Sequence, residues 1–360
     1  MQINITDLPS ERFFVKLNKE FAYKINNSVT MKYGSIRKLA KVMNLWSGSL
    51  CSWRKNSNYP LKILSEICRL CEIDLNKEQQ NIIELKSCFY KNRNFGNAKS
   101  KPIYPKFPIT LTPELSSVIA HLFCDGCVST EKNGYLHVHY YNKDRGLLEI
   151  FKEHTRKVFG DFEIYQSKNK GVDFVTLPSP VGVILKTVVP DFNGKTCRIP
   201  DFIKNSNDTE IKRTFVKAFA DDEGSVKFKP PYRHIELSCS NENMLFDLRK
   251  MIEEFGIRCG TVCYKNHNGF DFYYFYVRGY ENLKKFKESI DFIHKEKANK
   301  LESILNSKQI PHYGQVESKE LVINLLKSGR KRTEIAKELN RNISTIDYHI
   351  RILRQKGVIN

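Results

Sequence analysis

The chain has 360 residues, and its 59 Lys and Arg against 40 Asp and Glu give a formal net charge of +19. Hydrophobic residues make up 41% of the chain, which excludes wholesale disorder, and the length favours more than one compact unit. The strong positive charge indicates a polyanionic partner, with nucleic acid as the default interpretation.

The opening segment MQINITDLPSERFFVKLNK lacks the basic start and apolar run of a secretory signal, and no stretch approaches the roughly 18 apolar residues of a membrane helix. We therefore expect a cytoplasmic protein that does not bind membranes. The ten cysteines follow no dense disulfide framework, which indicates reduced thiols. Two CxxC pairs, Cys68 with Cys71 and Cys124 with Cys127, leave zinc binding as a minor alternative.

Residues 1–90 are predicted to form a helical N-terminal domain. Within it, the segment GSIRKLAKVMNLWSGSLCSWRKNSN resembles a repressor-type helix-turn-helix, with a first helix at Ile36 to Val42 and a reading helix at Ser47 to Arg54. The alternative is a plain helical cap on the rest of the protein. Four basic residues of this segment would contact DNA phosphates: Arg37, Lys38, Arg54 and Lys55.

Residues 91–113 are rich in Lys, Asn and Pro and are predicted to be an extended linker. The chain after this linker contains an internal repeat, with one copy at residues 114–200 and a second at residues 201–310. Each copy reads as a helix, an acid-Gly turn, an alternating strand, an Asn-containing turn and an amphipathic helix that ends at Phe-Gly. Asn142 in the first copy is matched with Asn241 in the second, with a slip of one residue.

The two acid-Gly turns, Asp125-Gly126 and Glu223-Gly224, are the candidate catalytic elements. Glycine at a helix end permits a left-handed backbone and a sharp turn into the following strand. The preceding acid then lies at the helix C-terminus, where the helix dipole disfavours negative charge, so a divalent cation would compensate it. Two such acids brought together by helix packing would hold Mg²⁺ against a phosphodiester. A solvated acid-Gly turn without chemistry is the alternative, and the duplication argues against it.

The segments VIAHLFCDG and VKAFADDEG, which contain these turns, resemble the paired signature helices of the LAGLIDADG homing endonucleases. This resemblance implies an α+β fold of two pseudosymmetric αββαββα repeats that form a DNA-binding saddle, with the two signature helices at the centre. It implies that Asp125 and Glu223 bind Mg²⁺ or Mn²⁺, together with the backbone at Gly126 and Gly224. Lys143 stands where close relatives have a catalytic basic residue.

The resemblance also implies that alternating side chains on the saddle strands read double-stranded DNA in the major groove. In the first repeat these are Tyr135, His137, His139 and Asn142. In the second repeat they are Lys227, His234, Glu236, Ser238 and Ser240. Asp222 departs from the family pattern, because a small residue is usual at this helix crossing, and we expect it to pair locally with a Lys.

Leu283 to Leu305 read as one long helical pattern, and residues 315–360 follow as a C-terminal domain that resembles a winged helix-turn-helix. Its helices are predicted at about Lys319 to Leu326, Arg332 to Leu339 and Ser344 to Gln355, with Ser344 as an N-cap. The third helix would present Thr345, Tyr348 and Arg351 to a groove, although protein contact is an alternative.

These patterns leave two functions open. The first is a free-standing, monomeric, site-specific and metal-dependent DNA endonuclease of the homing type. The second is a non-cleaving transcription regulator or RNA-splicing cofactor on the same scaffold. Retention of both acids, Asp125 and Glu223, favours the endonuclease.

Overall fold

The computed structural model describes residues 1–88, 100–130, 135–169, 171–229, 232–267, 269–307, 315–339, 341 and 343–359. The chain divides into two compact units, residues 1–304 and 305–360. The predicted 91–99 part of the linker lies outside the described residues. Across the described residues, none of the helices has the length and apolar character needed to cross a membrane.

The N-terminal segment combines helices with a three-stranded antiparallel sheet in the order β3-β2-β4, so the prediction of an all-helical domain was incomplete. The run FFVKL forms β2, and four of its five side chains are buried, which is typical of an internal strand and carries no helical period. The elements are β1 Gln2–Ile3, β2 Phe13–Leu17, α1 Lys19–Tyr33, α2 Ile36–Val42, α3 Ser47–Asn56, β3 Asn58–Pro60, α4 Leu61–Leu70 and β4 Ile82–Ser87, with short 3₁₀ turns at Ile5–Asp7, Ser10–Arg12 and Gln79–Asn81.

The helices α2 and α3 lie where the sequence predicted the N-terminal helix pair, and Leu39, Ala40 and Leu50 form its buried contacts. Part of the predicted linker is folded against the preceding segment. The strand β5, Ile109–Thr110, pairs with β1, and Ile103 exchanges backbone hydrogen bonds with Leu85. These main-chain contacts join the N-terminal segment to the part of the linker that leads into the first repeat.

Both repeats have the predicted αββαββα order. The first consists of α5 Pro113–Cys124, β6 Gly126–Thr130, β7 Leu136–Asn142, α6 Arg145–Phe159, β8 Tyr165–Asn169, β9 Val172–Leu177 and α7 Ser179–Val188. After a short helix, α8 Asp201–Lys204, the second consists of α9 Thr209–Glu223, β10 Gly224–Lys229, β11 Tyr232–Cys239, α10 Glu242–Glu253, β12 Cys263–His267, β13 Phe270–Arg278 and α11 Tyr280–Ser289, followed by α12 Lys295–Asn306.

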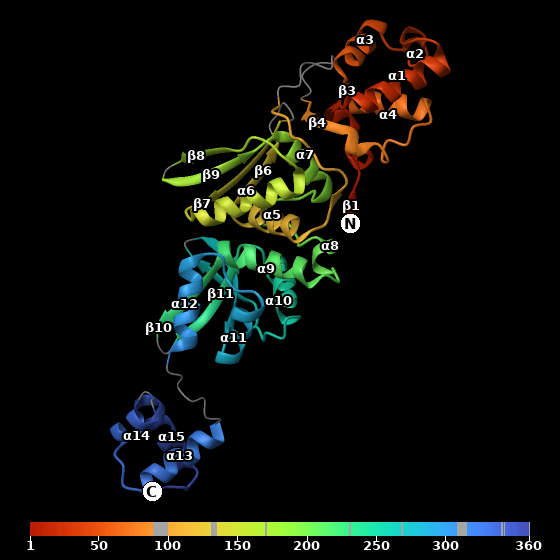
Figure 1. Ribbon diagram of the computed structural model, residues 1–360. Helices are drawn as coiled ribbons and strands as arrows, with labels where there is room; N and C mark the ends of the chain where they lie inside the picture. Colours follow the sequence, from red (N-terminus) through yellow and green to blue (C-terminus); the bar gives the residue numbers. More distant parts are fainter. Residues whose placement is uncertain are drawn as a thin grey trace. The chain divides into compact units, whose positions relative to one another are not determined.

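The two repeats also share one sheet topology. The strand orders β6-β7-β9-β8 and β10-β11-β13-β12 are equivalent, and every pairing within them is antiparallel. Alternate residues of β7, Leu136, Val138 and Tyr140, are buried beneath the helices, which leaves the other face of the sheet open. Helices α5 and α9 face one another where the two repeats meet (Figure 1).

The predicted single helix over Leu283 to Leu305 was wrong, because α11 and α12 are separated by residues 290–294. Asp291 has φ = 57°, a left-handed conformation that ends the α-helical path. The break frees the backbone N–H groups of Ile293 and His294, which both donate to the carboxylate of Asp221. These hydrogen bonds therefore hold the start of α12 against the end of α9.

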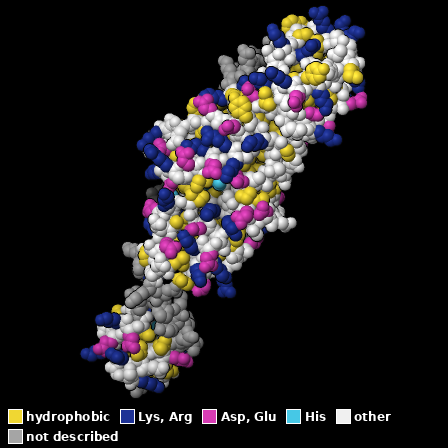
Figure 2. Space-filling view, in the orientation of Figure 1, with side chains coloured by type: hydrophobic (Ala, Val, Ile, Leu, Met, Phe, Trp, Pro, Cys, Tyr) yellow, Lys and Arg dark blue, Asp and Glu magenta, His cyan; other side chains and the backbone are white. Residues whose placement is uncertain are grey.

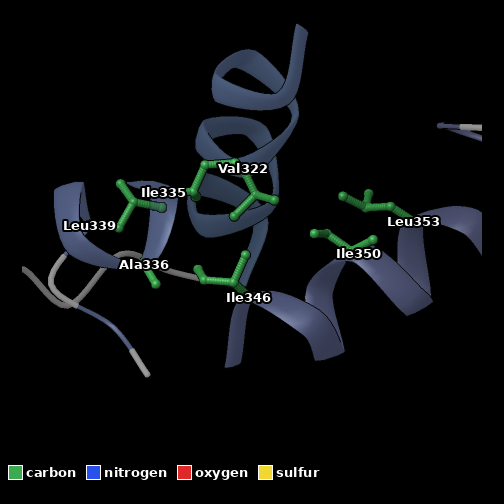
Figure 3. Packing of buried hydrophobic residues seen from close by; sticks show 7 residues of the cluster. All are labelled: Val322, Ile335, Ala336, Leu339, Ile346, Ile350 and Leu353. Atoms are coloured by element: carbon green, nitrogen blue, oxygen red, sulfur yellow. The ribbon is translucent and has the colours of Figure 1, made fainter. Parts of the chain in front are cut away.

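The C-terminal unit consists of three helices, α13 Gln315–Lys327, α14 Arg332–Glu338 and α15 Ile343–Gln355, close to the predicted bounds. Ser344 is the second residue of α15 and not its N-cap, since the helix starts one residue earlier. Among described residues 356–359, no strand follows α15. The buried core joins all three helices (Figure 3) and comprises Val322, Ile335, Ala336, Leu339, Ile346, Ile350 and Leu353.

Gly126 and Gly224 do not adopt the left-handed backbone that the sequence suggested. Gly224 has φ = −82° and ψ = 151°, and the φ angle of Gly126 is not positive either. Their requirement for glycine is steric. A Cβ on Gly126 would lie 2.4 Å from the Cα of Leu122, and one on Gly224 would lie 2.3 Å from the backbone oxygen of Ala220. Each strand thus starts against the last turn of its helix, where no side chain fits.

We expect Gly224→Ala to lower the free energy of unfolding by about 1–3 kcal/mol, because backbone must shift to admit the methyl group. Urea denaturation would measure this. Gly194→Ala is the matched control, since its Cβ would meet only the backbone oxygen of Phe123 at 4.0 Å. Equal stability of the two variants would contradict the steric explanation.

Candidate active site at the helix interface

Small residues let α5 and α9 approach closely, and those at the interface, Ser117, Ala120, Ala218 and Ala220, are all buried. Ser116, also buried, donates a hydrogen bond of 2.8 Å from its hydroxyl to the backbone oxygen of Ile211 at the start of α9. Close packing along this line carries the C-terminal ends of both helices, and the acids there, to the same end of the interface.

Asp125 is the C-cap of α5 and Glu223 is the last residue of α9. Loss of surrounding water raises the pKa of Glu223 to about 7, and the charges of Asp125 and Asp222 add to this effect. Asp125 reaches solvent, yet partial desolvation and the charge of Asp222 raise its pKa to about 6. The two predicted catalytic carboxylates therefore share one electrostatic environment, in which their negative charges repel.

Asp222, whose charge acts on both site acids, has a fully buried side chain that pairs across the repeat interface. Its Oδ2 accepts a hydrogen bond from Nδ1 of His121 at 2.8 Å, and its Oδ1 accepts one from the hydroxyl of Tyr140 at 2.8 Å. Burial opposes charge on His121, but the Asp222 carboxylate outweighs it and raises the His121 pKa. The expected local Lys partner for Asp222 was wrong, because its side chain points into the first repeat.

Asn142 extends this network to Asp125. Its Nδ2 lies 3.1 Å from Oδ1 of Asp222 and 3.4 Å from Oδ2 of Asp125, while its Oδ1 accepts the backbone N–H of Asp144. The side chain is therefore held from both ends. Asn142 was predicted to contact DNA, and the structure places it beside Asp125, where it can orient that carboxylate.

The strand register corrects the predicted match between Asn142 and Asn241. Gly126 pairs with Tyr140, and Gly224 pairs with Leu237, so the equivalent of Asn142 is Cys239. Asn241 instead corresponds to Asp144, and both are helix N-caps. The sequence analysis matched the two asparagines by residue type. The register shows that the hairpin joining the first two strands is one residue shorter in the second repeat.

Lys297 of α12 is a site residue that the sequence analysis missed. Its ammonium donates to backbone oxygens at the end of α9, reaching that of Ala220 at 3.2 Å and also that of Asp221. Burial lowers its pKa, and the charges of Asp221, Asp222, Asp125 and Glu223 oppose this effect. Lys297 lies near the acids because the chain breaks between α11 and α12. No local sequence pattern predicted this break.

The predicted DNA-reading residues lie on the open faces of the two sheets. His137 and His139 of β7 alternate with buried neighbours, and Tyr135 immediately precedes that strand. His234, Glu236 and Ser238 alternate in the same way on β11, and Ser240 is exposed just beyond it. Lys227, which was predicted to contact DNA, is exposed on β10 and lies opposite His234 in the strand register. Lys143, the predicted catalytic basic residue, is exposed in the turn after β7.

The remaining predicted contacts lie outside the repeats. Arg54 is exposed on α3, and Figure 2 shows Lys and Arg side chains gathered over the α2 and α3 end of the N-terminal segment. On α15, Tyr348 and Arg351 are exposed side by side, with the guanidinium carbon 5.7 Å from the ring centre, and Thr345 is half-buried.

The donor set at the helix ends fits a hard divalent cation. Asp125 and Glu223 offer carboxylate oxygens, and burial together with neighbouring carboxylates raises the pKa of each, so a bound cation would favour their charged forms. Among the described residues, no group of three or more His, Cys, Asp or Glu side chains could hold a metal ion, and this includes both CxxC pairs. A cation here would rely on few protein ligands and on water or phosphate oxygens, as Mg²⁺ commonly does.

Asp222→Ala is expected to lower the free energy of unfolding by about 3–5 kcal/mol, because it removes the carboxylate that accepts hydrogen bonds from the buried Nδ1 of His121 and the buried hydroxyl of Tyr140. Denaturant titration measures the loss. Asp201→Ala is the control, since the Asp201 side chain is 81% exposed. A loss below about 1 kcal/mol for Asp222→Ala would show that the network does not hold the repeats together.

Glu223→Gln should stabilise the protein at alkaline pH in the presence of EDTA. The folded-state pKa of Glu223, about 7, is above its ordinary value of 4.5, so the native state binds more protons than the unfolded state between these values. Stability therefore falls as pH rises through this window, and the variant escapes that loss. Its advantage should grow from near zero at pH 4.5 to about 1–3 kcal/mol at pH 8. A pH-independent difference, or one matched by exposed Glu288→Gln, would contradict this.

Comparison with known proteins identifies one part of the chain. Residues 210–291 match the family model described as LAGLIDADG-like domain. The replication factor C small subunit of Methanocaldococcus jannaschii is 27% identical over 222 residues, which cover 60% of this chain and 11% of that protein. The glutamine-fructose-6-phosphate aminotransferase of the same organism is 22% identical over 308 residues, covering 80% of this chain and 27% of that protein. The chain thus spans about a tenth and about a quarter of these relatives.

Among solved structures, the crystal structure of I-DmoI in complex with DNA and Mn is similar, with a TM-score of 0.39 and 13% identity over 56% of this chain and 100% of that one. The family match covers α9 and the whole β10-β11-β13-β12 sheet, and the first repeat has an equivalent order of helices and strands. Residues 210–291 therefore form a LAGLIDADG-like domain.

Proposed function

We propose that the protein is a site-specific endonuclease that hydrolyses double-stranded DNA with the help of Mg²⁺ or Mn²⁺. The observation that carries this proposal is the pair of pseudosymmetric helices that bring Asp125 and Glu223 into one electrostatic environment at the start of two open-faced sheets. Two related acids at a two-fold interface suit a substrate with two antiparallel strands, one for each repeat. The internal pair makes the protein active as a monomer.

Asp125 and Glu223 would hold the cation, which supplies a polarised water and a positive charge beside the leaving oxygen. The surrounding residues keep the acids in place. Asn142 holds Oδ2 of Asp125, and Asp222 holds Asn142, so the first acid is oriented by a chain of hydrogen bonds that starts in the other repeat. Lys297 moderates the charge at the end of α9, and the exposed side chain of Lys143 is available to the phosphate.

Contacts with DNA would be divided between the sheets and the flanking helices. Alternating polar and aromatic side chains on β7 and β11 face outward and are available to base edges. We propose that α2 with α3, and α14 with α15, act as helix-turn-helix modules whose basic residues contact phosphates and add affinity. The phosphate contacts of these two modules would extend the footprint on DNA beyond the saddle.

The curated relatives support a self-contained module. Their names state different activities, and each matches this chain over a minor part of its own length. A segment that recurs in proteins with such different names is separable from those activities, which fits an endonuclease of the homing type. We place its action in the cytoplasm, where duplex DNA and Mg²⁺ are available.

The test is cleavage of a plasmid library carrying randomised inserts, with Mg²⁺ and with EDTA. We expect the wild-type protein to cut a subset of sites, and Asp125→Asn and Glu223→Gln each to reduce cutting by at least about 100-fold, because each removes a ligand charge. Asp161→Asn, whose side chain is 84% exposed, is the control. Sequence-selective binding by wild type without any cutting would contradict the endonuclease and favour a binding protein.

A further inference from the structure

The open face of the second sheet carries a row of aromatic rings that the predicted reading of base edges does not use. On β13, Phe275 and Val277 are buried beneath the helices, so alternate residues point to the open face. These residues are Phe270, Phe272, Tyr274 and Tyr276, followed by Arg278. Four consecutive outward positions on one strand are therefore aromatic.

These rings are accessible. Phe270 is 69% exposed and Phe272 is 41% exposed, which is costly for large apolar side chains unless a partner covers them. Tyr274 and Tyr276 are half-exposed, with ring centres 5.2 Å apart. The guanidinium of Arg278 lies 4.0 Å from the centre of the Tyr276 ring and covers that end of the row.

Positive charge accompanies the rings. The register places Lys265 opposite Phe272, and Lys227 in line with His234 and Arg278, all on the open face. Glu236, opposite Tyr276, is the one acidic residue among the described outward-facing residues of this sheet. Aromatic rings interleaved with cations are the combination that binds the bases and the phosphates of an unpaired nucleic-acid strand.

The spacing of the rings distinguishes an unpaired strand from a duplex. Successive outward residues of a strand are separated by about 6.6 Å, which is twice the rise per residue. Bases within one strand of a duplex are stacked at about 3.4 Å, so they cannot each meet a separate ring of this row. An extended strand whose bases are unstacked from one another can place them on successive rings.

We propose that the face formed by Phe270, Phe272 and Tyr274 binds an unpaired segment of a DNA strand by stacking its bases on these rings, with Lys265 and Lys227 contacting the phosphates. The proposal rests on the proposed function only in taking DNA as the nucleic acid. The strand β10, which forms the far edge of this sheet, begins at Gly224 directly after Glu223. The unpaired segment would therefore lie on the sheet that leads away from the second catalytic acid.

The experiment uses the full-length protein and a short fluorescently labelled oligothymidylate, with binding followed by anisotropy. Phe272→Ala and Tyr274→Ala should each weaken binding by roughly 5- to 100-fold, the range expected for loss of one base-aromatic stack. The matched control is Tyr264→Ala on β12. Tyr264 is 57% exposed, but it pairs with Tyr273 and belongs to the opposite face of the same sheet. Thermal unfolding of each variant verifies that the fold is retained.

Unchanged oligothymidylate binding by the folded Phe272→Ala and Tyr274→Ala variants would overturn the proposal, and so would an equal loss with Tyr264→Ala. An equal loss for a fully paired duplex would show a general contribution to binding instead of stacking on free bases. Tighter binding of oligouridylate than of oligothymidylate would assign the face to RNA and overturn the DNA assignment.

Failure of this inference can be told apart from failure of the proposed endonuclease. Asp125→Asn should abolish duplex cutting and leave oligothymidylate binding unchanged, because Asp125 belongs to the first repeat and not to this sheet. If the wild-type protein cuts while the ring variants bind normally, only the stacking inference falls. If the wild-type protein does not cut while the ring variants lose binding, only the endonuclease falls.

Discussion

The pairing of α5 with α9 is the constraint on which the rest of the molecule depends. Small residues bring the two helices together, and a carboxylate from α9, that of Asp222, is buried in the first repeat. A buried carboxylate is tolerated only when hydrogen bonds replace its water, and His121 and Tyr140 supply them from the partner repeat. Because these partners belong to different repeats, neither repeat satisfies its own polar groups alone.

This interface is pseudosymmetric in its backbone and asymmetric in its chemistry. By register, the equivalents of Tyr140 and Asn142 are Leu237 and Cys239, and a half-buried thiol, Cys124, stands in α5 where α9 has Asp222. The hydrogen-bond network therefore reaches one of the two candidate acids, Asp125. Duplication provides two similar positions for acids, and divergence of the neighbours then gives those acids different surroundings.

The charge of the chain is distributed in a way that suits separate tasks. The α2 and α3 segment carries basic side chains and contains no acidic residue between positions 34 and 58. The open faces of the sheets carry histidine, tyrosine and phenylalanine at many outward positions. Phosphate contacts give affinity without selectivity, whereas contacts with bases require side chains that meet rings or edges. A division between basic helices and aromatic sheets satisfies both needs.

Several features follow from the sequence by itself. The repeated pattern of helix, acid-Gly turn and alternating strand is local, so it predicted the first helix, the turn and a following strand of each repeat and singled out Asp125 and Glu223. The full αββαββα order was predicted from the family resemblance. The helix pairs near each end of the chain were also predicted to within a few residues, because their apolar spacing has a clear helical period.

Other features were decided by contacts between residues distant in the chain. The partners of Asp222, Tyr140 and His121, are 82 and 101 positions away, and Lys297 reaches α9 only because a break after α11 redirects the chain. The equivalence of Asn142 with Cys239 depends on strand register, and the need for Gly126 and Gly224 depends on how near each strand starts to its helix. Local sequence patterns report the period and the ends of an element, but distances between elements are set by packing, and the tertiary structure alone supplies them.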